Sequence, residues 1–266
     1  MSRRKTTRDL EQELGLRDKD WYSIYQWNSL KVKTYTEKVS WLILHDFDSI
    51  VINYEHLRKD DFKIKDHHGQ CERGTPISQI TEKRLLRAMY NLHTVNLLGI
   101  IKDYEIPLKS IQSAHHGDID LLAMDEDEHK IRVIEAKKPG SSESLLKGVL
   151  QIYTYTKLVS SVRDSFLRSY DIQSDVKLSP VVLTFDSAAS GKQLLNMGAY
   201  PEMKALLKKL NQDLLDDGIG PIEFYSSNLS DEETKGCLRE EAYKDKSYKI
   251  YFKKRDFDLR LTRHSV

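Results

Sequence analysis

Acidic and basic residues stand inside two otherwise apolar runs between positions 117 and 138, in the stretch GDIDLLAMDEDEHKIRVIEAKK. Both runs are typical of β-strands, and the polar tip 125–129 between them predicts a tight connection. A carboxylate inside a buried strand is costly unless a partner compensates its charge. This stretch is therefore the strongest candidate for a chemical site.

The register of the predicted hairpin determines which of these side chains meet. A turn centred between Asp127 and Glu128 pairs positions whose numbers sum to 255, so Asp120 lies opposite Glu135 and Asp118 lies opposite Lys137. Two cross-strand carboxylates with Cβ atoms roughly 4.5–5.5 Å apart repel each other unless a cation lies between them or one is protonated. The pattern thus predicts that carboxylates and a lysine converge on one patch.

Two interpretations fit that patch. Hard divalent cations favour such oxygen ligands, and Mg²⁺ in particular is held by one or two carboxylates together with waters and substrate phosphates. Lys137 could then orient or polarise a water and offset developing phosphate charge. The alternative is an ordinary ion pair of Lys137 with Asp118 or Glu135 on a solvated sheet.

The spacing D-x14-E-x-K, formed by Asp120, Glu135 and Lys137, resembles the PD-(D/E)XK nuclease superfamily. The segment GDIDLLA is especially similar to Holliday-junction resolvases and to RecB-type nuclease domains. The resemblance implies that Asp120 and Glu135 bind a metal ion, that the carbonyl of Ala136 adds a ligand, and that Lys137 assists the attacking water. Ile119 stands where the superfamily has its leading proline.

Two further features agree with this resemblance. RecB-type members carry Q-x-x-x-Y on the helix after the E-x-K strand, and Gln151 and Tyr155 match it sixteen residues after Glu135. At i, i+4 the two side chains share a helix face, beside Gly148, which would allow a close approach to the sheet. The resemblance gives both a substrate-binding role, and a half-buried helix face is the alternative.

The first predicted helix supplies two more candidates. At 100° per residue, Glu82 lies on the same face as Met89 and Ile100, with His93 beside them. Resolvase-like members place a glutamate on this helix and RecB-type members a histidine, so Glu82 is expected as a catalytic residue and His93 as a candidate. A glutamate in a first turn is also favoured by the helix dipole alone.

The remaining polar residues near the motif are weaker candidates. His115 and His116 could contact a metal or a phosphate, although paired histidines at a strand end are usually surface residues. Asp118 competes with Asp120 as an auxiliary ligand. The acidic tip 125–128 is expected to be a turn without a site role.

Alternating helices and strands are expected to position these residues, in the order α-β-β-β-α-β-α-β. The predicted elements are a helix from Thr75-Pro76 to about Lys102, an extended segment near 107–116, strands over 117–124 and 130–138, a helix over 141–163, a strand over 178–186, a helix over 201–215 and a strand over 222–225. This order predicts an α/β fold with a mixed sheet. Together with the resemblance it predicts a restriction-endonuclease-like αβββαβ core with N- and C-terminal additions.

Three units are predicted along the chain. Residues 1–74 hold all three tryptophans and are expected to pack as an aromatic-rich subdomain that ends in a charged loop over 58–74. Residues 75–230 form the nuclease core. Residues 231–266 form a basic segment with alternating apolar residues. Its lysines, Lys253 and Lys254 among them, are expected to bind DNA backbone phosphates, and a solvated edge hairpin is the alternative.

Composition limits the setting more than the activity. A net charge of +1 neither requires nor excludes a polyanionic partner. Two distant cysteines, no apolar leader and no apolar run of about 18–20 residues predict a reducing, cytoplasmic setting away from the membrane, or nucleoid or nuclear if the source is eukaryotic.

The predicted function is a Mg²⁺-dependent deoxyribonuclease in which Mn²⁺ can substitute. DNA is the expected partner, and RNA, exo- versus endonuclease action and a homodimer are left open. The alternatives are an inactive nucleic-acid-binding or assembly protein with the same fold, and an ordinary α/β interaction protein.

Overall fold

A mixed β-sheet forms the centre of the protein. The computed structural model describes residues 19–26, 35–63, 69–72, 80–111, 117–242, 247–253 and 260–266. These residues form a seven-stranded sheet in the order β10 (Leu261–His264), β7 (Glu223–Ser227), β6 (Lys177–Phe185), β5 (Lys130–Ala136), β4 (Asp118–Asp125), β3 (Gly99–Pro107) and β2 (Thr94–Val95). The neighbours of β6 are parallel to it, and all other neighbouring pairs are antiparallel. The predicted α/β class with a mixed sheet is confirmed.

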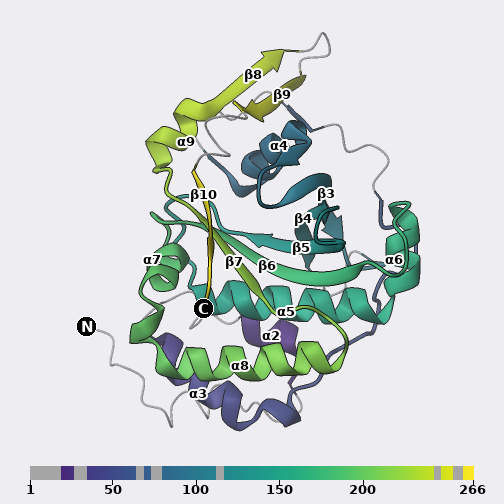
Figure 1. Cartoon of the computed structure of the whole chain (residues 1–266), viewed down its shortest axis with the longest axis vertical. Helices are drawn as coiled ribbons and strands as arrows, with labels where there is room; N and C mark the ends of the chain where they lie inside the picture. Colours follow the sequence, from purple (N-terminus) through teal and green to yellow (C-terminus); the bar gives the residue numbers. More distant parts are fainter. Residues whose placement is uncertain are drawn as a thin grey trace.

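Helices cover one face of this sheet (Figure 1). They are α2 (Trp21–Tyr25), α3 (Thr36–His45), α5 (Leu145–Ser161), α6 (Arg163–Ser169), α7 (Ala189–Leu195) and α8 (Pro201–Asp216), with short 3-10 turns η3 (Phe47–Ser49) and η4 (Met197–Ala199). Strand side chains alternate between faces, so Val133 and Val182 pack in the core on the α5 side. This arrangement places α5 directly over the end of β5.

The opposite face carries α4 (Glu82–Leu92) and a second, smaller sheet. Among the described residues that sheet has the order β1 (Gln70–Glu72), β9 (Ser247–Phe252) and β8 (Leu238–Ala242), and α9 (Asp231–Cys237) leads into β8. Ile134 faces this side and shares a core with Met89 of α4 and Ile250 of β9. α4 is therefore held between the two sheets, with its first residue near the end of β5.

Local sequence signals explain where the helices around β5 begin. Ser144 and Thr81 are the N-caps of α5 and α4, and each accepts a hydrogen bond from a backbone N–H in the first turn. Pro201 begins α8, where its fixed φ and missing N–H cost nothing. The predicted helices over 141–163 and 201–215 are thus confirmed to within a few residues.

The helix predicted to run to Lys102 is wrong at its C-terminal end. α4 ends at Leu92, because His93 adopts a left-handed φ of 62° and the chain turns back into β2 and β3. The C-terminal part of that predicted helix instead forms the edge strand β2, a turn and the start of β3, Gly99–Pro107. The extended segment expected near 107–116 overlaps β3 only at Pro107, and residues 112–116 lie outside the described residues. The predicted start at Thr75-Pro76 lies outside the described residues.

The aromatic residues of the predicted N-terminal unit do not form a core of their own. Trp21 and Phe47 belong to the same core as α5, and the Trp21 ring lies edge-on to Tyr153 with centroids 4.9 Å apart. β1 also occupies part of the charged segment predicted as a loop, because its backbone pairs with β9. The described part of residues 1–74 is therefore divided between the core on the α5 side and the small sheet.

The C-terminal segment divides between the two sheets. The predicted alternation is confirmed on β9, where Tyr248, Ile250 and Phe252 are buried against α4. β9 pairs with β8 and β1, whereas β10 pairs with β7 at the edge of the main sheet. The segment is thus two separate additions rather than one edge hairpin. None of the helices in the described part of the chain is long and apolar enough to cross a membrane.

Candidate functional site

The β4–β5 hairpin has the register that the sequence predicts. Leu121 pairs with Ile134 and Asp125 with Lys130, so the numbers of paired residues sum to 255. Beyond the Leu121–Ile134 pair, Asp120 Oδ2 accepts a 2.7 Å hydrogen bond from the backbone N–H of Ala136. The carboxylate of Asp120 is thereby fixed at the end of β5, beside Glu135.

Lys137 is the centre of the cluster. Its ammonium donates to Glu135 Oε1 at 2.6 Å and to Gln151 Oε1 at 3.1 Å, and it pairs with Glu143 Oε2 at 2.8 Å. An ammonium group has three protons, so these three acceptors satisfy it completely. The side chains of Lys137 and Glu135 are each 3% exposed. Within a dry site, each of these contacts is therefore worth more than it would be on the surface.

Carboxylates crowd this lysine. Burial raises the pKa of Asp120 well above its ordinary range, and the charges of Glu135 and Glu82 raise it further. Burial likewise raises the pKa of Glu135 and of Glu82, and nearby lysines only partly offset the rise. The three predicted acids, Asp120, Glu135 and Glu82, are therefore close enough to repel one another. Glu82 reaches the cluster because it is the first residue of α4.

For Lys137 and Glu143, in contrast, the neighbouring charges outweigh burial and favour the ionised form. Burial alone would lower the pKa of Lys137, but four carboxylates, Glu135 first, outweigh it and raise the pKa. Burial would raise the pKa of Glu143, and Lys137 and Lys147 outweigh it and lower the pKa. Both groups are therefore ionised at neutral pH. The cluster as a whole holds four carboxylates and three ammonium groups, Lys138 included, so negative charge remains in excess when all are ionised.

The Q-x-x-x-Y pair faces the cluster from α5. Gln151 Oε1 accepts a hydrogen bond from the Lys137 ammonium. The hydroxyl of Tyr155 lies only 2.1 Å from the position that a Cβ on residue 117 would occupy, so a larger residue than Gly117 would clash with it. Gly117 therefore gives the tyrosine its room. A Cβ on Gly148 would lie 3.4 Å from Val182 Cγ1, an ordinary contact, so the close approach of α5 does not require glycine there. Since Gln151 and Tyr155 are buried, their visible role is to support Lys137 and the floor of the site.

Other predicted candidates lie elsewhere. Asp118 is exposed, and the charges nearest to it belong to Lys109, Glu105, Lys83 and Arg58 rather than to Lys137, so the expected Asp118–Lys137 pairing is wrong.

His93 is exposed at the C-terminal end of α4, roughly 16 Å along the helix from Glu82. Lys253 is exposed after β9 on the small sheet. His115, His116 and Lys254 lie outside the described residues.

Two residues that the sequence pattern did not single out, Glu143 and Lys147, also belong to the cluster. Glu143 lies one residue before the N-cap of α5, and its two oxygens contact the ammonium groups of Lys137 and Lys147. The i, i+4 spacing of Glu143 and Lys147 was a visible signal for an ion pair on a helix. Nothing in the sequence indicated that the same carboxylate reaches Lys137.

The residues present fit a hard divalent cation in chemistry but are not arranged as a finished metal centre. Within the described ranges, no three Asp, Glu, His or Cys side chains converge as a metal-binding group. Asp120 and Glu135 nevertheless supply two under-compensated carboxylates at one strand end, and Mg²⁺ needs only one or two protein carboxylates. Glu135 would have to leave Lys137 to become a ligand.

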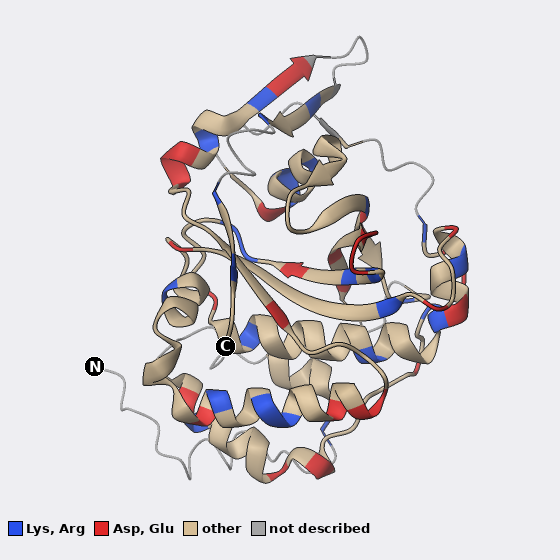
Figure 2. Cartoon of the chain, in the orientation of Figure 1, with Lys and Arg blue, Asp and Glu red and all other residues tan. Residues whose placement is uncertain are grey.

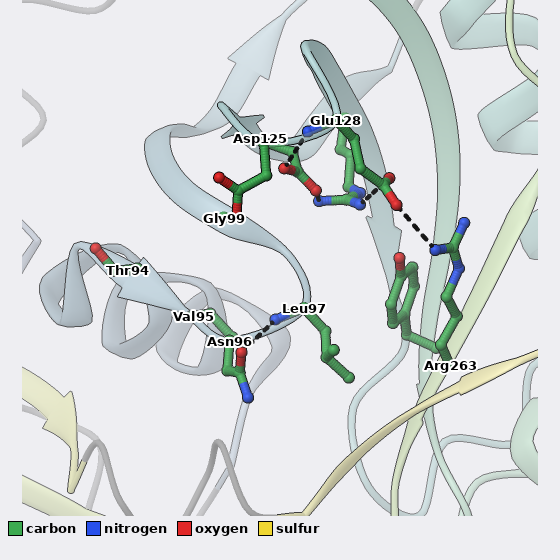
Figure 3. A pocket seen from close by; sticks show the side chains of 11 residues that line it. Thr94, Val95, Asn96, Leu97, Gly99, Asp125, Glu128 and Arg263 are labelled. Carbon is green, nitrogen blue, oxygen red and sulfur yellow. Dashed lines mark hydrogen bonds and ion pairs between the residues drawn. The ribbon is translucent and has the colours of Figure 1, made fainter.

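A hollow of about 390 Å³ opens at the other end of the hairpin (Figure 3). Its charged residues pair among themselves: Arg132 contacts Asp125 at 2.6 Å and Glu128 at 3.1 Å, and Arg263 contacts Glu128 at 3.3 Å. Arg132 is five residues from Lys137, roughly 16 Å along the strand, so this hollow is separate from the cluster.

Figure 2 shows that charged residues lie on the central strands as well as on the outer helices.

Glu223 of β7 borders this network. Burial alone would raise the pKa of Glu223, but hydrogen bonds from Lys130, Tyr225 and Ser179 outweigh it and lower the pKa to about 2. The acidic turn and its neighbours thus form an ion network that also borders the hollow.

Comparisons with models of protein families, with curated proteins and with solved structures find no match.

Proposed function

We propose that the protein is a divalent-metal-dependent nuclease with a PD-(D/E)XK core, in which Asp120 and Glu135 hold Mg²⁺ and Lys137 acts on the attacking water. The observation that carries the proposal is that Asp120, Glu135, Lys137 and Glu82 lie together at one strand end, short of positive charge, with Glu135 and Lys137 buried and Asp120 and Glu82 half-buried. Surface ion pairs need no such burial, and burying carboxylates without full compensation costs stability. Sites that retain such a cost are characteristic of function.

Each residue has a distinct role in this mechanism. A bound divalent cation would activate water at neutral pH and neutralise charge on the phosphate. The Asp120 carboxylate is held in place by the Ala136 N–H, which orients one oxygen and leaves the other available. If Glu135 turned to the cation, one Lys137 proton would be free to orient the water and stabilise developing negative charge, while Gln151 and Glu143 still hold the ammonium. Glu82, from α4, closes the acidic side of the site and is suited to accept a proton or position water.

DNA is the proposed substrate, with cleavage of a phosphodiester bond by in-line attack. Lys147 is buried against Glu143, whereas, among the described residues, Lys138 lies near the cluster, and Lys83, Lys109 and Arg58 lie near Asp118 on the adjoining side. These side chains are better placed to contact a phosphate backbone near the site than Lys253 on the small sheet. The C-terminal lysines would then add affinity at a distance.

A digestion panel tests the proposal. Circular, linear and four-way-junction DNA, and RNA of matched length, are incubated with the protein and Mg²⁺ or Mn²⁺. Lys137→Ala and Asp120→Asn should each lower metal-dependent cleavage by several orders of magnitude, because both groups act on the transition state. Glu126→Gln, in the exposed turn of the same hairpin, is the matched control and should cleave normally. Full activity in either site variant would refute the assignment.

One observation favours a second candidate, a nucleic-acid-binding or assembly protein with an inactive core. All three protons of Lys137 already have acceptors, so the cluster is also a self-sufficient ion network. This candidate predicts nucleic-acid binding without cleavage under every metal condition. It also predicts that Lys137→Ala impairs stability rather than catalysis, since removing one member of a buried network leaves charges unpaired.

A further inference from the structure

Glu143 connects Lys137, at the end of β5, with Lys147, on α5. Its Oε2 lies 2.8 Å from the ammonium of Lys137 at the end of β5, and its Oε1 contacts the ammonium of Lys147 in the first turn of α5. A carboxylate that bridges two buried lysines is held at both oxygens and has little freedom to rotate.

The loop that carries Glu143 is itself anchored. The Glu143 N–H donates to Ser141 Oγ at 3.3 Å, and the Ser141 carbonyl accepts from the N–H of Ala189 on α7 at 2.7 Å. On the next residue, the Ser144 side chain caps α5. Leu145 N–H donates to Gln193 Oε1 at 2.8 Å. Glu143 therefore projects from a fixed segment, independently of β5.

The acceptors of Lys137 differ in what else they can do. Glu135 is on the same strand and is one of the two carboxylates best placed to hold a cation, whereas Glu143 and Gln151 belong to the α5 side. When Glu135 turns to a cation, Lys137 loses one of three acceptors. Without Glu143 only a neutral amide would remain, and a long, flexible side chain held by one hydrogen bond can move away from the reacting group.

We propose that Glu143 is a positioning residue that keeps the Lys137 ammonium in place when Glu135 coordinates the metal ion, and that Lys147 holds Glu143 in turn. This inference rests on the proposed function, since it concerns the same site. The simpler alternative is that Glu143 serves only as the partner of Lys147 and stabilises the start of α5.

The direct test follows the Lys137 ammonium by ¹⁵N-detected NMR in the whole protein, with Mg²⁺ alone and no nucleic acid. Lysine ammonium protons are observable when hydrogen bonds protect them. In the wild type the Lys137 signal should persist with and without Mg²⁺. In Glu143→Gln it should persist without metal, because Glu135 still binds it, and disappear when Mg²⁺ is added. Persistence of the signal in the Mg²⁺-loaded variant would overturn the proposal.

Kinetics give a second readout. Glu143→Gln should lower kcat about 100-fold with KM unchanged, the scale of loss expected when a catalytic group is misplaced by about 1 Å. Glu143→Asp keeps the charge on a shorter side chain and should recover part of the rate, which also covers the case in which the glutamine variant does not fold. Lys147→Met should lose less, because Glu143 still contacts Lys137. Equal losses in Glu143→Gln and Lys147→Met would instead support the simpler alternative.

The outcomes separate the two proposals. Wild-type cleavage together with a fully active Glu143→Gln refutes the positioning role and leaves the nuclease function intact. Metal-dependent loss of the Lys137 signal in Glu143→Gln, without cleavage by the wild type, supports the positioning role and refutes the nuclease function. Failure of the wild type to bind Mg²⁺ refutes both.

Discussion

Binding of Mg²⁺ should stabilise the folded protein, because Asp120 and Glu135 are crowded by like charge. Burial and neighbouring carboxylates raise the pKa of both groups, so their ionised forms are disfavoured in the metal-free fold. A cation that binds the ionised pair relieves this repulsion and is absent from the unfolded chain. The perturbation is therefore the addition of Mg²⁺ to the metal-free protein.

The expected magnitude follows from binding linkage. At a free Mg²⁺ concentration 100 times the Kd, one site adds about 2.7 kcal/mol to the free energy of unfolding. For a chain of 266 residues, 1 kcal/mol corresponds to roughly 2–4 °C in Tm. A saturating titration should thus raise Tm by about 5–10 °C.

The effect has a defined pH dependence. A carboxyl group with a pKa raised on folding contributes stability below its unfolded pKa, and this contribution is lost as pH rises through the folded value. The metal-free protein should therefore lose stability as pH rises above the ordinary carboxyl range. Mg²⁺ binds the ionised pair, so the gain in Tm should grow over the same range and vanish at low pH.

Thermal unfolding followed by circular dichroism measures all of this. Asp120→Asn and Glu135→Gln should each abolish most of the Mg²⁺-dependent gain, while Glu126→Gln in the exposed turn should keep it. An unchanged Tm for the wild type at saturating Mg²⁺ would refute the reasoning. So would an equal gain in Asp120→Asn, which would indicate that Mg²⁺ acts elsewhere.

Three other outcomes are expected. Gly117→Ala should lower the free energy of unfolding by about 1–3 kcal/mol, because its Cβ meets a buried tyrosine hydroxyl, while Gly148→Ala should be tolerated; equal chemical denaturation midpoints would contradict this. Glu223, with a pKa near 2, should contribute about 3 kcal/mol that is lost as pH falls from 4.5 toward 2, and Glu223→Gln should flatten acid unfolding in that window. The double variant Lys253→Glu, Lys254→Glu should weaken DNA binding equally for unrelated sequences. It should also reduce the slope of log Kobs against log[salt] by about 0.9 per lost phosphate contact. Binding isotherms identical to those of the wild type at every salt concentration would show that the two lysines are not involved.

Local pattern was sufficient for the hairpin and for its chemistry. Strand alternation has a period of two, so a turn centred between Asp127 and Glu128 fixes the register, and Asp120 next to Glu135 follows from it. Helical spacing likewise placed Gln151 and Tyr155 on one face of α5. In the first case the two residues face each other across a single β-hairpin, and in the second they are four residues apart on one helix.

Local pattern gave the wrong secondary structure where one apolar run is compatible with both a helix and a strand. The run Leu97–Ile101 fits a helix face by periodicity, yet it turns and enters the sheet at Gly99, because pairing of β3 with β4 satisfies the backbone from there on; Leu98 and Ile101 are buried, whereas Leu97 is exposed. The end of α4 at His93 depends on that tertiary choice. The aromatic residues near Trp21 could equally have formed a separate unit, and only their packing against Tyr153 decided otherwise.

The sequence by itself therefore determined the α/β class, the hairpin register and the acid–lysine motif, since these depend on short-range periodicity. Only the tertiary structure decided which charges surround Lys137. Asp118 was expected there and lies among other residues, while Glu143, eight positions before Gln151, reaches the lysine because α5 crosses the end of β5. Contacts between elements depend on how helices pack over a sheet, and the spacing of residues along one chain does not contain that information.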